Sequence, residues 1–187
     1  TEMYVGARGY LDHYVLQEEG DGASQVMNRF GYHKDNSVLS TDTFTFSGEV
    51  VRNNLTLTPD GAECETNLYG LVIGHGDMHV DNNTLVDHVH ADCVSNELYK
   101  HVLNHHSTAV FNGKVFVHRD SQRIGATAGQ LDEEGLFYLR TRGVSEERAR
   151  ILMMQAFAQD VIDIIDIEPL KALIEDRVQT RLHSFAA

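Results

Sequence analysis

Residues 50–61, VVRNNLTLTPDG, carry the pattern that decides the fold. β-Branched residues lead into alternating positions, Asn53, Leu55 and Leu57, which is typical of a strand whose two faces meet different surroundings. Residues 59–61, Pro-Asp-Gly, then end the strand, because these residue types favour tight turns. The segment therefore predicts a short strand followed directly by a turn.

Similar strand-and-turn units recur along the first 124 residues. Related-looking pieces return roughly every 20–25 residues, which favours a stacked β-solenoid with irregular turns. The pattern alone fits a β-sandwich nearly as well, because alternation does not say which strands pair. The expected strands are residues 10–17, 26–32, 43–46, 50–57, 68–73 and 109–118.

The amino-acid composition changes near Gln130. Residues 1–124 are rich in Val, Thr, Asn, Gly and His, whereas residues 130–187 are rich in Leu, Ile, Ala, Glu and Arg. The first set favours strands and the second favours helices. We therefore expect a mainly β chain, with a β-solenoid core over residues 1–128 and a small α-helical domain over residues 129–187.

Three helices are expected in the second part. The first begins at Asp132 and stops at Gly143, since glycine accepts the left-handed conformation that often follows a helix. The second starts from an N-cap at Ser145 and runs to about residue 165. The third has Pro169 in its first turn.

The second helix has more apolar surface than contact with one neighbour requires. A surface helix needs an apolar arc of a little over about 100°, and this helix has roughly twice that. The surplus indicates either a central helix covered by its own chain or a helix that also contacts a partner chain. Its two adjacent stripes are Ala149, Met153, Ala156, Phe157, Val161 and Ile164, and Ile151, Met154, Ala158, Ile162 and Ile165.

The charge of the chain narrows the classes of partner. Its 187 residues have a formal net charge of −13 at pH 7. Such a field repels phosphate backbones and anionic lipid surfaces, so we expect neither nucleic acid nor a membrane as partner. The two cysteines give no disulfide framework, and the start of the sequence at Thr1 shows no secretory signal. These features predict a cytoplasmic location.

Residues 87–93, DHVHADC, form the most site-like stretch. In a strand His88 and His90 would point to the same face, and with Cys93 they could bind zinc or iron. The alternative is that polar strand positions happen to be histidine, since the chain contains 11 of them. No nucleophile elbow or phosphate-binding loop is present, so we do not expect an enzyme.

Several stretches, taken in order, resemble the SufD family of iron–sulfur cluster assembly proteins. The resemblance covers nearly the whole chain. It implies a right-handed parallel β-helix followed by a small helical domain, in a non-catalytic scaffold subunit. The matching stretches are residues 51–55 (VRNNL), 65–70 (ETNLYG), 80–82 (VDN), 87–88 (DH), 95–100 (SNELYK), 109–117 (AVFNGKVFV), 129–134 (GQLDEE) and 137–143 (FYLRTRG).

The resemblance also implies partners. The β-helix would pair edge to edge with SufB, and the helical region would bind the ATPase SufC. ATP would then be bound by SufC, and an iron–sulfur cluster would be handled transiently by the complex, so this chain is expected to hold no stable cofactor. Exposed β-helix edges also suggest pairing of two copies of the isolated chain. The implied partner-binding residues are Phe137, Leu139, Arg140, Arg142, Gly143, Met153, Ala156 and Phe157.

One departure from the family limits what the resemblance implies. In the family, further strands separate the equivalents of Ile124 and Gly125 and end in a Lys-Cys-Ser-His run, whereas here these two residues are adjacent. The family's interface histidine therefore has no counterpart in this sequence, and no cluster-binding residue is transferred. The rival hypotheses are a free-standing metal-binding protein and a β-helical carbohydrate-active enzyme.

Overall fold

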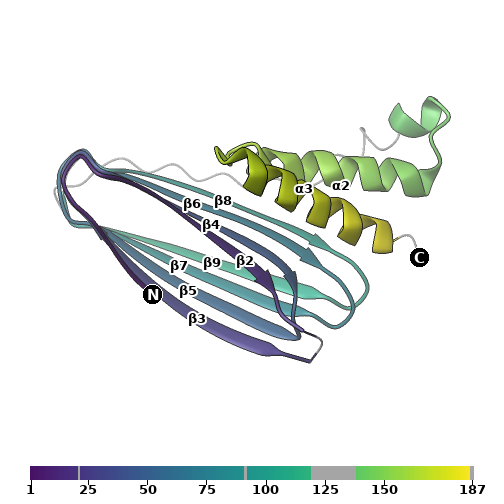
Figure 1. Ribbon diagram of the computed structural model, residues 1–187, viewed down its shortest axis with the longest axis horizontal. Coiled ribbons are helices and arrows are strands. Elements are labelled where there is room, and N and C mark those ends of the chain that lie inside the picture. Colours follow the sequence, from purple (N-terminus) through teal and green to yellow (C-terminus); the bar gives the residue numbers. More distant parts are fainter. Residues whose placement is uncertain (21, 91, 119–137, 186–187) are drawn as a thin grey trace.

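The computed structural model describes residues 1–20, 22–90, 92–118 and 138–185 (Figure 1). Strands fill the first part and helices fill the second. The labelled elements are β1 (Glu2–Val5), β2 (Tyr10–Glu18), β3 (Ser24–His33), β4 (Val38–Ser47), β5 (Val50–Pro59), β6 (Glu65–Gly74), β7 (His79–His88), β8 (Val94–Leu103), β9 (Thr108–Val117), α2 (Glu146–Ile162) and α3 (Glu168–Ser184).

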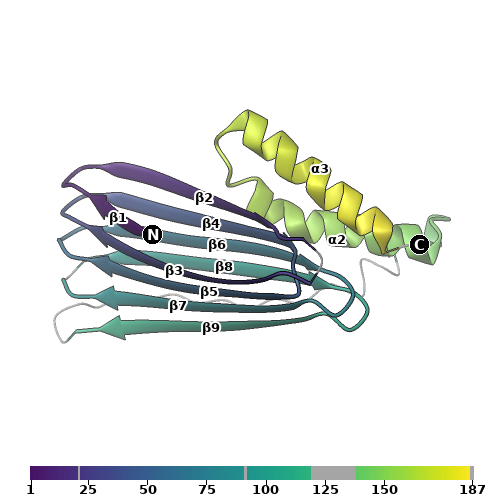
Figure 2. The same ribbon diagram turned by 60° about the horizontal axis from the view of Figure 1, so that its bottom comes forward.

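The strands wind into a parallel β-solenoid of about four turns. One sheet has the order β1-β3-β5-β7-β9 and the other has the order β2-β4-β6-β8, and every described pairing is parallel. Each strand thus pairs with the strand two steps along the chain, and the turns stack as in Figure 2. The expectation of a parallel β-helix with a helical tail is confirmed, and the sandwich alternative is wrong.

The turns are longer than the sequence pattern suggested. Ser24 pairs with Val50, and Val50 pairs with His79, so a turn takes 26 to 29 residues. The expected period of roughly 20–25 residues was too short because each full turn contains two strands of about ten residues and two bends.

Strands β7 and β8 were not among the strands expected from the sequence. Their polar residues obscured the pattern, but several of these point into the solenoid. Asn53 on β5 donates a hydrogen bond of 2.9 Å to Asn82 on β7, and it exchanges hydrogen bonds of 3.0 Å with Gln17 on β2. Because buried amides need partners, stacking in register satisfies them along the solenoid axis.

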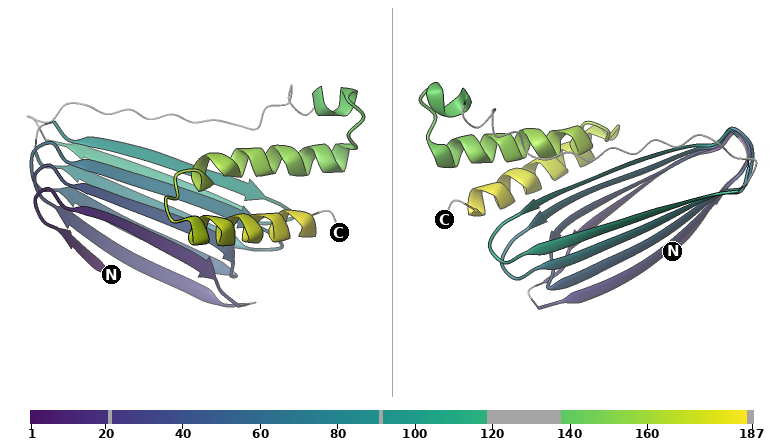
Figure 3. Two further views of the ribbon diagram at one scale, coloured as in Figure 1. Left: turned by 45° about the horizontal axis from the view of Figure 1, so that its top comes forward. Right: turned by 180° about the vertical axis from the view of Figure 1, so that it is seen from behind.

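The central strands of the even-numbered sheet, β4 and β6, are buried on both faces, unlike the strands of the odd-numbered sheet. The inner face of this sheet lines the solenoid, and its outer face is covered by α2 and α3 (Figures 1 and 3). A sheet that is covered on both sides carries apolar residues on both, as in β4, where Phe44 and Phe46 point outward yet are buried. The apolar layer between the sheet and the helices includes Phe44, Phe46, Leu71, Ile73, Val102, Ala158, Val161, Ile162, Ile174, Val178 and Leu182.

The helix ends agree closely with the sequence signals. Ser145 caps α2 by accepting a hydrogen bond from the Arg148 backbone N–H, at 3.4 Å, and Gly143 has a left-handed φ of 87° where the preceding helical turn stops. Pro169 lies in the first turn of α3. Helix α2 ends at Ile162 rather than near residue 165. The expected start of the first helix and the expected domain boundary near residue 128 lie outside the described residues.

Candidate functional site

The surface of α2 that faces away from the solenoid is the first candidate site. Leu152 is 41% exposed there, and Ala156, one turn further along, is also exposed. A cavity of about 440 Å³ adjoins them. It is lined by Ser145, Glu147, Arg148, Ile151, Leu152, Gln155 and His183. We call Arg148, Leu152, Gln155 and Ala156 the outer α2 surface.

The predicted partner-binding residues on α2 differ in their accessibility. Ala156 is exposed, whereas Met153 and Phe157 are half-buried. Phe157 packs against the apolar layer between the helices and the even-numbered sheet. One apolar stripe of the helix is therefore used largely within the chain, and Ala156 offers the better contact to another protein.

Lys100 holds α2 against the solenoid. Its ammonium group donates a hydrogen bond of 2.8 Å to the Phe157 carbonyl oxygen, lies 4.2 Å from the centroid of the Phe157 ring, and pairs with the Asp160 carboxylate. The sequence alone indicated no role for Lys100, because its partners Phe157 and Asp160 lie 57 and 60 positions further along the chain. Sequence reasoning also missed Leu152, and the available signal was an apolar residue on the otherwise polar side of the helix, beside Gln155 and Gln159.

The predicted residues before α2 form a short helical turn over residues 138–141. Arg140 lies 3.4 Å from Glu146 in an exposed ion pair, which ties the turn to the start of α2. The Arg142 guanidinium lies 5.2 Å from the Tyr138 ring centroid. Leu139 is half-buried, and Phe137 lies outside the described residues. These side chains stand near the N-terminal end of α2, so they extend the candidate surface beyond the cavity.

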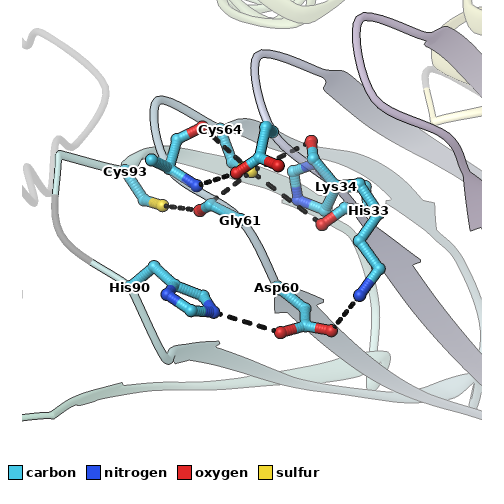
Figure 4. A network of polar contacts seen from close by, with 9 residues as sticks. His33, Lys34, Asp60, Gly61, Cys64, His90 and Cys93 are labelled. Carbon is cyan, nitrogen blue, oxygen red and sulfur yellow. Dashed lines mark hydrogen bonds and ion pairs between the residues drawn. The ribbon is translucent and has the colours of Figure 1, made fainter.

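The second candidate site is the solenoid bend that contains residues 87–93 (Figure 4). Strand β7 ends at His88, so His90 lies in the bend and does not share a strand face with His88. His88 is buried and its Nε2 lies 3.0 Å from Ser95 Oγ, whereas His90 is exposed and lies 3.2 Å from the Asp60 carboxylate. The expected alignment of the two histidines is therefore wrong.

Cys93 does not complete a three-ligand set with these histidines. It is buried, and its thiol donates a hydrogen bond of 3.1 Å to the Gly61 carbonyl. Within the described ranges, no group of three or more His, Cys, Asp or Glu side chains is arranged to hold a metal ion. The site proposed from His88, His90 and Cys93 is thus not assembled there.

Burial controls the titration of the groups inside this bend. Burial lowers the pKa of His33 to about 4, and the ring is hydrogen-bonded at 2.9 Å to both Ser37 and Thr66. Burial, followed by the charge of the neighbouring Cys93, raises the pKa of the Cys64 thiol to about 11. The bend interior therefore holds a neutral imidazole and a protonated thiol at neutral pH.

The fold and the candidate surfaces define a class of protein: a β-solenoid with a helical hairpin that covers one sheet and leaves part of its own surface open. The family described as "SUF system FeS cluster assembly, SufBD core domain" matches residues 1–124 and 123–157. The chain belongs to this SufBD family. The two matched pieces meet at the Ile124–Gly125 junction, where the resemblance implies additional strands.

Curated relatives support this family assignment. The SufD protein of Escherichia coli is 24% identical over 212 positions, covering 95% of this chain and 50% of the relative. A SufBD family protein of Mycobacterium leprae is 28% identical over 197 positions, covering 81% and 50%. A Synechocystis SufBD family protein is 25% identical over 216 positions, covering 97% and 48%. The chain thus spans about half the length of these relatives and is SufD-like.

A helix that crosses a membrane has to be both long and apolar. In the part of the chain that is described, no helix has both the length and the apolar character needed to cross a bilayer.

Proposed function

We propose that this chain acts as a non-catalytic scaffold in an iron–sulfur cluster assembly complex with a SufB-type subunit and the ATPase SufC. The observation that carries the proposal is the outer α2 surface, in a chain of the SufBD family. Helix α2 is anchored to the solenoid through its inner side, while Leu152 and Ala156 stay exposed beside a cavity. A rigidly mounted helix with an open apolar surface is suited to binding another protein.

The end of the solenoid supports contact with a second subunit. Within the described strands, β9 pairs with β7 on one side, and its other backbone edge faces no described strand. The side chains there are unusually exposed for apolar residues, including Val110 at 47% and Phe111 at 40%. An open edge with apolar side chains favours pairing with another strand, from a SufB-type subunit or from a second copy of this chain.

In this proposal, the chemistry is also divided between the subunits. ATP is bound by the SufC partner, and the cluster is handled transiently at the subunit contacts rather than stored in this chain. Cys64 and Cys93 are not joined in a disulfide, which suits a reducing compartment and supports a cytoplasmic location.

Co-purification with the SufC ATPase tests the proposed helix contact. We expect Ala156→Asp to weaken the complex by about 30-fold or more, because a charge would replace an exposed apolar side chain on the surface proposed to bind SufC. Phe157→Asp is less informative, since it also disturbs the packing of α2 on the solenoid.

The matched control is Ala172→Asp, which makes the same change at an exposed position on α3. We expect this variant to bind SufC like the wild type. Unchanged binding by Ala156→Asp, with the solenoid folded by circular dichroism, would show that the outer α2 surface is not the docking site. Hydrolysis of ATP by the isolated chain would contradict the non-catalytic role.

A further inference from the structure

The two cysteines of the chain occupy equivalent positions on successive turns of the solenoid. Cys64 directly precedes β6, and Cys93 directly precedes β8. Glu65 pairs with Val94 in the parallel register, and the Val94 backbone N–H donates a hydrogen bond of 2.8 Å to the Cys64 carbonyl. The two side chains therefore stack one above the other, although they are separated by 29 positions in the sequence.

Both sulfur atoms face the same carbonyl oxygen inside the bend. Gly61 O lies 3.3 Å from Cys64 Sγ and 3.1 Å from Cys93 Sγ (Figure 4). Cys64 is 1% exposed and Cys93 is 4% exposed, so the pair is enclosed by protein. Two sulfur atoms and one oxygen atom thus converge on one buried position.

The spacing of the strands decides which chemistry suits the pair. Neighbouring strands lie about 4.8 Å apart, and in-register side chains project in parallel. A disulfide needs Cβ atoms roughly 3.5–4.5 Å apart, so closing one here would require the two turns to approach. Two sulfur atoms that project in parallel from adjacent strands can bind one ion between them without that approach.

We propose that Cys64 and Cys93 form a two-coordinate thiolate site for a soft monovalent cation such as Cu(I), with the Gly61 carbonyl facing the ion. Thiolates select soft cations, and zinc normally requires four ligands. The residues that the structure describes provide no third ionisable ligand in a suitable group, which disfavours zinc and iron at this position. Binding releases two thiol protons to solvent and transfers no electrons.

Both sulfur atoms are shielded from water by the surrounding protein. The exposed ion pairs of Asp60 with Lys34 and His90 lie on the outer side of the same bend and contribute no ligand to the sulfur pair.

Titration of the purified chain with Cu(I), anaerobically and against a chromogenic Cu(I) chelator, tests the site. We expect one equivalent to bind, with an X-ray absorption spectrum that shows two sulfur neighbours. The sequence has no other cysteine, and the cysteine variants separate these two thiols from the five methionine thioethers, which could also supply sulfur neighbours. Cys64→Ser and Cys93→Ser should each weaken Cu(I) binding by more than about 100-fold. Loss of a residue that only hydrogen-bonds to a metal ligand costs up to roughly that much, and loss of the ligand itself should cost more.

The control variant is His90→Ala, which should bind Cu(I) as the wild type does. Cys64→Ala and Cys93→Ala, checked by circular dichroism, provide a second test if a serine variant does not fold. The proposal is overturned if folded wild-type chain captures no copper, if a cysteine variant binds with unchanged affinity, or if the spectrum shows nitrogen ligands. Ready formation of a Cys64–Cys93 disulfide with oxidised glutathione would overturn the spacing argument. Co-purification with SufC is scored separately, so failure of one proposal leaves the other intact.

Discussion

Lys100 on β8 donates a hydrogen bond of 2.8 Å to the backbone carbonyl of Phe157 on α2. Lys100 is only 7% exposed, and its ammonium group is satisfied by the helix through this bond, the Phe157 ring and the Asp160 carboxylate. A buried ammonium group needs such partners, because removal from water without them is costly. This contact therefore couples the position of α2 to that of the solenoid.

Replacing Lys100 with methionine should loosen α2. We expect the free energy of unfolding to fall by about 2 kcal/mol, since the charge-assisted hydrogen bond to the Phe157 carbonyl and the ion pair with Asp160 are lost. Urea unfolding at neutral pH measures the change. Lys114→Met, on the exposed side of β9, is the control and should stay within about 0.5 kcal/mol of the wild type. Equal effects of the two substitutions would contradict the role given to Lys100.

The adjacent residues Asn53 and Asn54 offer a paired test of the strand register. Asn53 points inward and hydrogen-bonds Gln17 and Asn82, whereas Asn54 points outward and bonds Asn28 on the surface. Asn53→Ala should lower the free energy of unfolding by about 2–3 kcal/mol, because it leaves buried amides without a partner. Asn54→Ala should cost less than about 1 kcal/mol. The reverse order would show that the inward and outward faces have been exchanged.

Ionisation of Asp42 should lower the stability of the fold as the pH rises. Asp42 is 3% exposed beneath the helices, its Oδ1 has no hydrogen-bond partner, and burial followed by the charge of Asp12 raises its pKa to about 7. Between pH 4 and 7 the folded chain holds a proton that the unfolded chain has released, so this group's stabilising effect is lost as pH rises through 7.

Asp42→Asn should therefore raise the free energy of unfolding at pH 8, by about 2 kcal/mol, and have little effect at pH 4. Urea midpoints at the two pH values measure the difference. The exposed Asp176→Asn substitution changes the net charge equally and should show no such dependence. A gain that is the same at both pH values would mean that ionisation of Asp42 is not the cause.

His33 acts in the opposite direction. Burial lowers its pKa to about 4, so between pH 6.5 and 4 the unfolded chain binds a proton that the folded chain does not. Stability due to this group is thus lost as pH falls through that window. In the Asp42→Asn background, acidification from pH 6.5 to 4 should destabilise the fold, and His33→Gln should reduce the slope in part. Burial also lowers the pKa of His13, His75, His88 and His101, which contribute to the rest of the slope. An unchanged slope would exclude His33.

The sequence was informative where local chemistry determines structure. Ser145, Gly143 and Pro169 mark helix boundaries through backbone effects that act within a few residues, and all three positions are confirmed. The family resemblance supplied the parallel β-helix, which alternation alone could not distinguish from a sandwich. Alternation of apolar and polar residues predicts which face of a strand is buried, but it does not predict which strands are neighbours. The pairing of Ser24 with Val50 could therefore not be predicted from it.

Features that depend on stacking were not predictable from one sequence. Phe44 and Phe46 read as one face of a strand, and their burial depends on helices more than 100 residues later in the chain. His88 and His90 were aligned on the assumption of a continuous strand, whereas β7 ends between them. Cys64 and Cys93 are neighbours because they are one solenoid turn of 29 residues apart in the sequence. The sequence pattern predicted a shorter turn, so it did not bring them together.

The helical hairpin contacts three successive strands of one sheet, through Phe44 on β4, Leu71 on β6 and Val102 on β8. These strands belong to different turns, which are otherwise joined by backbone hydrogen bonds and by side chains stacked inside the solenoid. The hairpin therefore braces the stack: a force applied to α2 would be distributed over several turns at once, instead of pulling a single turn away from the end of the solenoid.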